Sequence, residues 1–598
     1  MRFQPFLLAL PLSVAPVLVT AQEPAASDEV TSLVREGRAL LDQGKPAEAL
    51  PLFEKAARAD ENRLRTRMWV LRAWMDSGRS NDTLNTLDEL DAKGVKGPEM
   101  DYLYGMAFAR RAQQNIAAGV TDASIQINFL DAVEFLGRAV KQDAERFYDA
   151  HLALATAAWY TQDLETARSA AEGAVKAQPE NGAAWLQLGK IAMSQFQVAQ
   201  SEEAWGEEAE GHWKAAKEAF SRAVEAFGTP KDDANAQVQL SQAALELGHA
   251  LVWKGRLAEA ADAYAVAIGW NPAAQNYGQM NGLLTPPRTA DTPAPSMPDD
   301  GSGDATGGED LPANQGTYFL RALEQGEKLF VKNFGAEDRR DATLLWWLGW
   351  AQLTWGDAQQ AAATLETTLE KAPNYTNTWF YLALARAKNE EWKAASDAIA
   401  RGWDADPPAM VAAMQSNLDF NVWTLERLIG KSFEENDLAR CALLAEVCAE
   451  AKKDDPRHWN NVGLFLRDEA DAMRIAAENG EGEEPDPEVL SDLYERSYEA
   501  YSRALRLDPE NPQLLNDTAV LLQYYLDRDL EKALEMYDRA HAGAEAALAQ
   551  PDLDEDTRAT METVLRDSAN NKALLLETMK GDAEDETSGS EDGEAQSS

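Results

Sequence analysis

The sequence lacks the side-chain groupings that carry common enzymatic chemistry. Its 598 residues contain no G-x-S-x-G, H-E-x-x-H or G-x-x-x-x-G-K-[ST] motif, and no G-x-G-x-x-G follows a predicted strand. The five histidines are scattered, and no two of them lie within five residues of each other. We therefore expect a protein that is not an enzyme, with no cofactor and no bound metal.

The two cysteines predict buried thiols. Cys441 and Cys448 lie seven residues apart in a stretch, 438–453, that predicts one helix. At about 1.5 Å per residue their Cα atoms would be about 10.5 Å apart, whereas a disulfide spans at most about 7 Å. We expect two small apolar side chains on one helical face, with no redox role.

The charge balance is strongly acidic. There are 101 Asp and Glu residues against 56 Lys and Arg, which gives a formal net charge of −45. The 45% hydrophobic content and the 17 tryptophans indicate a folded chain. Because an acidic surface repels phosphate backbones, nucleic-acid partners are not expected. The acidity favours basic protein partners, or else it is an adaptation to salty surroundings.

The first 21 residues resemble a secretory signal peptide. Arg2 precedes an apolar stretch of about 14 residues, and small residues end it at Ala21. Three prolines interrupt this stretch, which is also shorter than the ~20 residues of a membrane-spanning helix. We predict cleavage after Ala21 and an exported protein, periplasmic or secreted, with no membrane span after cleavage. The alternative is an uncleaved N-terminal anchor.

A pattern of Trp, Gly, Ala and Pro recurs along most of residues 30–545. One copy begins L-W-W-L-G at residue 345 and ends at Pro373, and the next begins at Trp379 and ends at Pro407. The two prolines are 34 residues apart. This period and the order W-x2-L-G-x2-Y…A-x3-F…P resemble the tetratricopeptide repeat. Further copies contain Gly37, Gly189, Gly248, Gly463 and Ala533.

The resemblance implies an all-α fold, a right-handed α-solenoid of helix-turn-helix repeats. The Gly and Ala positions are those at which two antiparallel helices approach closely, and copies must stack to bury their apolar faces. We predict two arrays, 22–272 and 317–580, the second ending in a helix near 557–580. The segment 273–316, rich in Pro, Gly and Asp, predicts a disordered linker. Residues 581–598, with seven acidic and no basic residues, predict a disordered acidic tail.

Three copies are longer than the pattern requires. The intervals from Gly105 to Ala132 and from Gly189 to Ala216 are each 27 residues, where 12 are usual, and a further excess lies between 463 and 497. These excesses predict lengthened helices or solvated loops. Insertions on one face of a solenoid that carry binding are the alternative.

Aromatic residues in the second array suggest one candidate binding surface. By the resemblance, first-helix residues that escape the core line a concave groove that holds extended peptides or partner helices. Trp346, Trp350 and Phe380 are the residues that we expect there. The alternative is ordinary packing between repeats.

A second candidate is the basic and amide set Arg457, Asn460 and Arg467, which follows Pro456. Guanidinium and amide groups facing a groove can hold a carboxylate. Some members of the family grip carboxylates in this way, with Lys, Asn and Arg from successive repeats. The alternative is an exposed, solvated helix face.

Together these features favour a non-catalytic protein-protein interaction scaffold or adaptor of the cell envelope or extracellular space, of exported bacterial type. Its partners, other proteins or peptides, would bind through the concave groove of the arrays. The alternative function is the binding subunit of an enzyme or of a secretion or assembly complex that recognises peptide or glycan.

Overall fold

The computed structural model describes residues 27–61, 63–202, 206–285, 316–335, 341–375, 377–480 and 484–591. Over these ranges the secondary structure is helical without strands, and helix-turn-helix pairs repeat along the chain. The predicted α-solenoid fold class is therefore confirmed. The predicted signal peptide, most of the linker and residues 592–598 lie outside the described residues.

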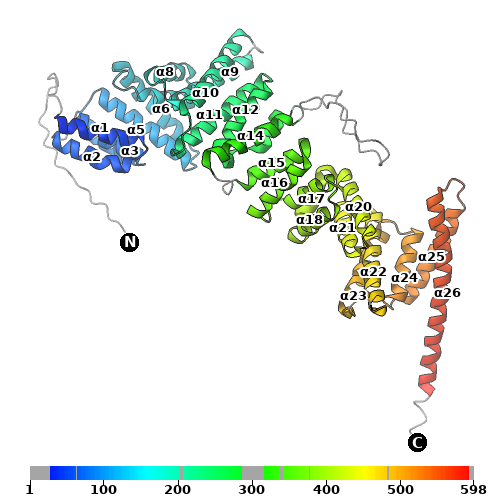
Figure 1. The fold of residues 1–598 in the computed structure, drawn as a ribbon. Helices are drawn as coiled ribbons and strands as arrows, with labels where there is room; N and C mark the ends of the chain where they lie inside the picture. The colour runs from blue at the N-terminus through cyan, green and yellow to red at the C-terminus, as the bar shows by residue number, and fades with distance from the viewer. Residues whose placement is uncertain are drawn as a thin grey trace, which may run out of the picture. The chain divides into compact units, whose positions relative to one another are not determined.

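The chain forms two compact units, residues 1–254 and 255–598. In unit 1, neighbouring helices stack in antiparallel pairs (Figure 1). The helices of unit 1 are α1 (Asp28–Asp42), α2 (Pro46–Ala59), α3 (Leu64–Asp76), α4 (Ser80–Ala92), α5 (Pro98–Ala117), α6 (Ser124–Gln142), α7 (Ala150–Tyr160), α8 (Leu164–Ala177), α9 (Gly182–Glu202), α10 (Glu207–Phe227) and α11 (Ala234–Trp253).

Short polar side chains start several of these helices. The side chains of Ser27, Asp163 and Asp233 accept hydrogen bonds from the backbone N–H groups of Val30, Thr166 and Ala236. Each cap satisfies a donor that the first helical turn leaves free. The caps therefore help to set where each of these helices begins.

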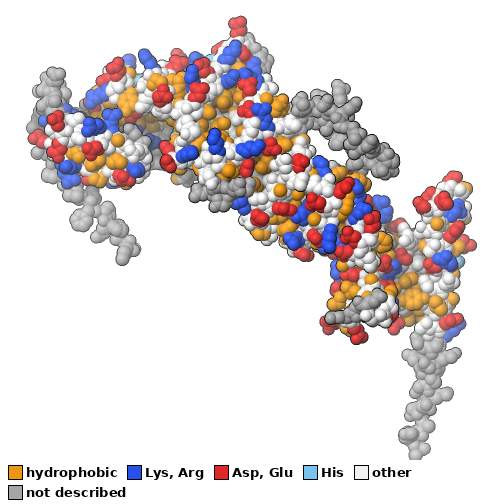
Figure 2. Space-filling view, viewed as in Figure 1, with side chains coloured by type: hydrophobic (Ala, Val, Ile, Leu, Met, Phe, Trp, Pro, Cys, Tyr) orange, Lys and Arg blue, Asp and Glu red, His pale blue; other side chains and the backbone are white. Residues whose placement is uncertain are grey.

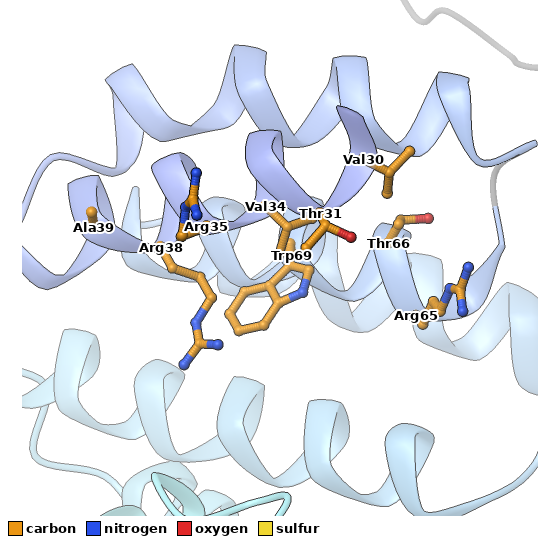
Figure 3. A pocket seen from close by; sticks show the side chains of 9 residues that line it. All are labelled: Val30, Thr31, Val34, Arg35, Arg38, Ala39, Arg65, Thr66 and Trp69. Carbon is orange, nitrogen blue, oxygen red and sulfur yellow. The ribbon is translucent and has the colours of Figure 1, made fainter. Parts of the chain in front are cut away.

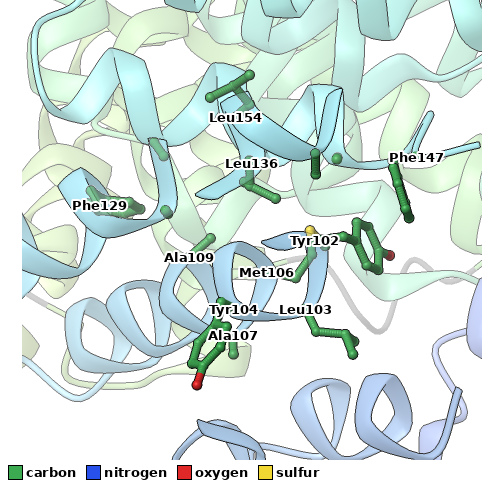
Figure 4. Packing of buried hydrophobic residues seen from close by; sticks show 14 of the residues in the cluster. Tyr102, Leu103, Tyr104, Met106, Ala107, Ala109, Phe129, Leu136, Phe147 and Leu154 are labelled. Carbon is green, nitrogen blue, oxygen red and sulfur yellow. The ribbon is translucent and has the colours of Figure 1, made fainter. Parts of the chain in front are cut away.

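The core of unit 1 is best seen between α5, α6 and α7 (Figure 4). Phe129 and Leu136 of α6 and Leu103 of α5 are fully buried, and alanines fill the narrow places between the helices. Gly105 of α5 lies directly against Leu136. The small residues thus stand where the helices approach and the large residues fill the wider gaps, as the repeat pattern predicts.

The long copies of the sequence are lengthened helices in the described residues. Helices α5 and α6 have 20 and 19 residues, and α9 and α10 have 21 each. In unit 2, α22 and α23 have 23 and 21 residues. For comparison, α7 of unit 1 has 11 residues. The extra length therefore extends helical hairpins.

Unit 2 continues the same construction. Its helices are α12 (Leu257–Trp270), η1 (Pro272–Ala274), α13 (Tyr277–Leu284), α14 (Thr317–Phe334), α15 (Ala342–Trp355), α16 (Ala358–Lys371), α17 (Thr378–Lys388), α18 (Trp392–Ala405), α19 (Pro407–Met414), η3 (Gln415–Asn417), α20 (Leu418–Glu434), α21 (Leu438–Ala451), α22 (Pro456–Glu478), α23 (Pro487–Leu507), α24 (Pro512–Tyr524), α25 (Leu530–Leu548) and α26 (Glu555–Glu591).

The predicted linker does not separate the helices on its two sides. Helix α14 packs alongside α12, and the contacts run parallel: Arg321 forms a bidentate pair with Asp262 at 2.6–3.0 Å, and Gly326 lies against Ile268. Gly326 permits this close approach because it has no Cβ. Helix α12 thus packs within unit 2, whereas the sequence places it at the end of the first array.

The start of the predicted linker is also ordered. Helix α13 lies within 273–316, and its residues Tyr277, Met280 and Leu284 are buried. Their spacing of three and four residues puts them on one helical face, which buries against the unit. The linker prediction therefore requires correction for the residues up to 285.

At the C-terminal end, α26 packs against α24 and α25. Leu575, which lies within the terminal helix expected near 557–580, is buried in this cluster. The helix runs on to Glu591, beyond residue 581, where the sequence predicts a disordered tail to begin. No helix in the described residues is long and apolar enough to cross a membrane.

Both cysteines are free and buried on α21, as predicted. Burial raises the pKa of the Cys441 thiol to about 11 and that of Cys448 to about 12. They belong to two neighbouring parts of the unit 2 core, where they serve as small apolar side chains.

Candidate functional site: the concave groove of unit 1

One face of each first helix in unit 1 lines a continuous groove. Helices α1, α3, α5, α7, α9 and α11 lie next to one another in this order. On α3 the lining residues include Arg65, Trp69, Arg72 and Asp76, which are spaced three or four apart and therefore lie on one face, and Met68 beside Trp69. The second helices of the pairs lie behind the first helices. We call this surface the unit 1 groove.

Three adjoining cavities make up the unit 1 groove. Their volumes are about 530, 470 and 470 Å³, from the α1 end to the α11 end. The first and second share Arg38, Arg65 and Trp69. The second and third share Arg72, Arg110, Asp149, Gln178 and Asn181. The shared walls make the groove one surface.

The cavity at the α1 end combines arginines with an aromatic ring (Figure 3). The Arg38 guanidinium lies 5.0 Å from the centre of the Trp69 ring and donates a hydrogen bond of 2.9 Å to the Tyr148 hydroxyl. Arg35, one turn earlier on α1, is exposed and donates to Ser32 Oγ at 3.4 Å. Neither guanidinium group forms an ion pair with a carboxylate of the described residues.

A charged network forms the middle of the groove. Arg72 donates to the Tyr102 hydroxyl at 2.7 Å, to Asp149 at 3.0 Å and to Asp76 at 3.1 Å. Tyr102 also donates to Asp149, at 2.8 Å. Arg110 lies 3.1 Å from the second oxygen of Asp76. These bonds cross-link α3, α5 and the start of α7, so they fix the shape of the groove floor.

The pKa shifts in this network keep its charges in place. Burial lowers the pKa of Arg72, but Tyr102, Asp149 and Asp76 outweigh that effect and raise it. Burial, with the Asp149 carboxylate beside it, raises the pKa of Tyr102. Arg72 therefore stays a cation and Tyr102 a neutral donor across the physiological pH range.

The cavity at the α11 end is rich in amides. Its lining includes Gln113, Gln178, Asn181, Gln187, Asn235, Gln239 and Gln242. In the described residues, the side chains of Asn235, Gln239 and Gln242 form no hydrogen bond, and Nε2 of the 7%-exposed Gln187 has no partner. An amide offers both a donor and an acceptor, which matches the alternating groups of an extended peptide backbone.

The groove is locally basic within an acidic chain. Its cationic lining residues are Arg35, Arg38, Arg65, Arg72, Arg110, Arg146 and Lys190, and its acidic ones are Asp76 and Asp149. On the face seen in Figure 2, acidic and basic side chains are mixed over the surface of unit 1. The cationic excess is thus a property of the groove, opposite in sign to the −45 of the chain.

The predicted aromatic surface lies elsewhere, in unit 2. Trp346 and Trp350 are half-buried on α15, and both rings contact Trp347, at 5.0 and 5.5 Å between centroids. Phe380 on α17 is 0% exposed and belongs to the core between repeats. The expectation that Phe380 lines a groove is therefore corrected: its position faces the neighbouring repeat. Trp346 also packs against that core, and the centroid of its ring lies 5.7 Å from that of the Tyr381 ring.

The predicted carboxylate-binding set is only partly assembled. Arg457 and Asn460 line one cavity of about 360 Å³, together with Glu426. Arg467 does not line it; its side chain is 17% exposed and pairs with Asp468 at 2.8 Å. Arg457 itself pairs with Asp455, the residue that caps α22, at 2.7 Å. The three predicted residues therefore do not form a common site.

The unit 1 groove escaped prediction because its cations are dispersed along the sequence. They occur singly or in pairs on separate helices between residues 35 and 190, so no basic stripe is visible in the chain. A usable signal was present on α3, where Arg65 and Arg72 are seven residues apart and share a helical face. Only the stacking of the first helices brings these faces together.

The described part of the chain contains no group of three or more His, Cys, Asp and Glu side chains that could hold a metal ion.

Comparison with known proteins agrees with this architecture. Residues 40–107 and 152–210 match models of the tetratricopeptide repeat. No curated protein matches the chain. Among solved structures, TTC0263, a thermophilic tetratricopeptide protein of Thermus thermophilus, is 18% identical; the alignment covers 36% of this chain and 98% of that one, with a TM-score of 0.27.

Two further structures are similar over longer stretches. YrrB, described as a tetratricopeptide protein with an unusual peptide-binding site, is 14% identical over 48% of this chain and 99% of its own, with a TM-score of 0.24. Yeast Tom70 is 12% identical over 92% of this chain and 99% of its own, with a TM-score of 0.19.

The segments 40–107 and 152–210 thus resemble tetratricopeptide repeats, in agreement with the helical hairpins of the fold. Proteins of this class generally act as non-catalytic scaffolds that bind other proteins or peptides.

Proposed function

We propose that this chain is a non-catalytic scaffold or adaptor that holds an extended segment of a partner protein in the unit 1 groove. The observation that carries the proposal is the continuity of the groove across six helices. With about 9 Å between adjacent helices the groove is about 45 Å long, which accommodates roughly 14 extended residues at about 3.3 Å each.

The lining suits a peptide. Amides at the α11 end can pair with backbone N–H and C=O groups, and Trp69, Met68 and Leu186 offer apolar contacts for side chains. The Arg72 network holds the floor before a ligand arrives. Binding to a surface that is already ordered avoids much of the entropic cost of association.

The location that we propose is the cell envelope or the extracellular space. It rests on the resemblance of residues 1–21 to a secretory signal peptide. Cell fractionation followed by intact-mass measurement tests it: we expect a mature chain that starts at Gln22 in the exported fraction. Recovery of the chain from the cytoplasm with residues 1–21 still attached would contradict export.

Filling the groove tests the scaffold function. Ala153 lines the third cavity on α7, so Ala153→Trp should obstruct it. Ala177, exposed at the end of α8, gives the matched control Ala177→Trp. We expect partners cross-linked to the purified full chain in its own cell extract to be lost with Ala153→Trp and kept with Ala177→Trp, both variants having wild-type circular dichroism. Equal retention by the two variants would show that partners bind outside the groove.

A further inference from the structure

Resting on the proposed function, we infer that the unit 1 groove selects a polarised ligand: an extended peptide with a run of acidic side chains over α1 and α3 and an uncharged stretch over α9 and α11. The inference follows from how the groove charges are paired and from where the unpaired ones lie.

Most groove cations already have carboxylate partners. Arg65 pairs with Asp60 at 3.1 Å, and Arg146 pairs with Glu99 at 2.5 Å. Arg72 pairs with Asp76 and Asp149, and Arg110 pairs with Asp76. Because the opposite charges of each pair largely cancel, these pairs contribute little to the electrostatic field in the groove. Three lining cations remain for which the described residues record no ion pair: Arg35, Arg38 and Lys190.

Two of the three lie together at the α1 end. Arg35 and Arg38 are one turn apart on α1 and line the same cavity. The recorded partners of Arg38, the Trp69 ring and the Tyr148 hydroxyl, are both uncharged, so they hold the guanidinium in place without neutralising it. A guanidinium placed in this way can bind carboxylates through charge-assisted, bidentate hydrogen bonds.

The α11 end has a different character. Amides dominate the lining of the cavity there. Arg72 and Arg110 line both this cavity and the middle one, whereas Lys190 lines this cavity alone. Burial lowers the pKa of Lys190, while the nearby Glu246 carboxylate acts in the opposite direction. A ligand carboxylate therefore finds a stronger partner at the α1 end, whereas uncharged backbone finds its partners at the α11 end.

The charge of the whole chain reinforces this choice. With a net charge of −45, most of the surface repels an acidic peptide. Such a peptide is attracted mainly to the places where cations are unpaired. Repulsion from the rest of the acidic surface therefore helps to orient the peptide as it approaches the groove. The predicted partner of this groove is thus acidic, opposite in sign to the basic partners that the composition alone favours.

The carboxylates could come from side chains or from a chain terminus. We assign them to side chains for two reasons. Arg35 and Arg38 offer two separate guanidinium groups along one helix, and the groove continues beyond them into the second cavity, so the peptide need not end there. A peptide with an amidated C-terminus distinguishes the two sources.

The test uses fluorescein-labelled synthetic peptides of about 14 residues, the length that spans the groove at about 3.3 Å per residue. One carries a run of glutamates at one end and Ser, Gly and Asn elsewhere, and the other has Gln in place of each Glu. With the full chain we expect the Glu peptide to bind roughly tenfold more tightly or better, measured by fluorescence anisotropy at low salt.

The charge-removing variant is Arg35→Ala/Arg38→Ala. Its matched control is Arg58→Ala/Arg222→Ala, which removes two arginines from the second helices α2 and α10, where each pairs locally with a glutamate. We expect the groove variant to lose roughly tenfold in affinity for the Glu peptide and to keep its affinity for the Gln peptide. The control should keep both. A photoreactive group at the glutamate end should cross-link to α1 or α3.

Several results would overturn the inference. Equal affinity for the Glu and Gln peptides, or an unchanged Glu-peptide affinity in the groove variant, removes the acidic preference and leaves the proposed scaffold function standing. Loss of binding on C-terminal amidation would move the recognised carboxylate to the chain terminus. If neither peptide binds, and Ala153→Trp also leaves every cellular partner in place, the proposed function fails together with the inference.

Discussion

Gly105 lies where α5 and α6 approach each other closely in their hairpin. A Cβ built on it would lie 2.5 Å from Leu136 Cγ and 2.9 Å from the Leu136 backbone nitrogen. Gly137, the next residue along α6, is a helical glycine whose added Cβ would meet no described atom within 4 Å. Gly105→Ala and Gly137→Ala are therefore a matched pair in one hairpin.

The magnitudes follow from two effects. Replacing a helical Gly by Ala favours the helix by about 1 kcal/mol at either position. Only Gly105→Ala adds a clash, and overpacking of this kind costs about 1–3 kcal/mol because Leu136 is 0% exposed and its backbone nitrogen cannot turn aside. The free energies of unfolding of the two variants should therefore differ by about 1–3 kcal/mol, with Gly137→Ala the more stable.

The suitable assay is hydrogen exchange of the full chain followed by mass spectrometry, because repeat arrays open in parts and a single unfolding midpoint averages over them. Peptides from α5 and α6 should exchange roughly tenfold faster in Gly105→Ala than in Gly137→Ala under conditions where exchange reports local opening. Equal or greater protection in Gly105→Ala would refute the close approach of the two helices at this residue.

Two predictions concern unit 2. Because burial raises the pKa of Cys441 to about 11 and of Cys448 to about 12, neither thiol should react with iodoacetamide at neutral pH until the chain is unfolded; rapid labelling of the native protein would contradict their burial. The hydrogen bond from Arg457 lowers the pKa of Asp455 from its ordinary 3.8 to about 2. The Asp455 cap therefore stabilises α22 fully at pH values above 3.8, and this stabilisation is lost as the pH falls through about 2. Asp455→Ala should cost about 1 kcal/mol near neutral pH, seen as faster exchange in the first turn of α22, and should have no effect at the acid end.

The repeat architecture could be predicted because it is local. A period of 34 residues, Gly and Ala at the contact positions and Pro at the ends are all properties of single hairpins, and Gly105 facing Leu136 shows one such contact in place. The packing of α14 on α12 was missed because it joins segments on the two sides of a long insertion. The close contact of Gly326 with Ile268 marks this packing, but it can be recognised only once the two helices are placed side by side.

The same reasoning explains the errors at the candidate sites. Sequence pattern separates apolar from polar residues, but an aromatic residue on a first helix can face either the groove or the next repeat, and Phe380 faces the repeat. Arg457, Asn460 and Arg467 lie along one helix, yet a helix rises about 1.5 Å per residue, so Arg467 lies about 15 Å further along the axis than Arg457. Arg467 is therefore beyond the cavity that the other two residues share. The register of each helix in the stack decides these cases.

The net charge of a chain with this fold does not determine the charge of one groove on it. The formal −45 belongs to a surface much larger than one groove, and charges act strongly only within about 10 Å at ordinary ionic strength. A ligand in the unit 1 groove meets Arg35, Arg38 and the neutralised Arg72 network, and the acidic residues that line the groove with them are Asp76 and Asp149. A stacked array can therefore present a basic groove on an acidic protein, because each first helix contributes one face, and the residues of that face need not follow the composition of the chain.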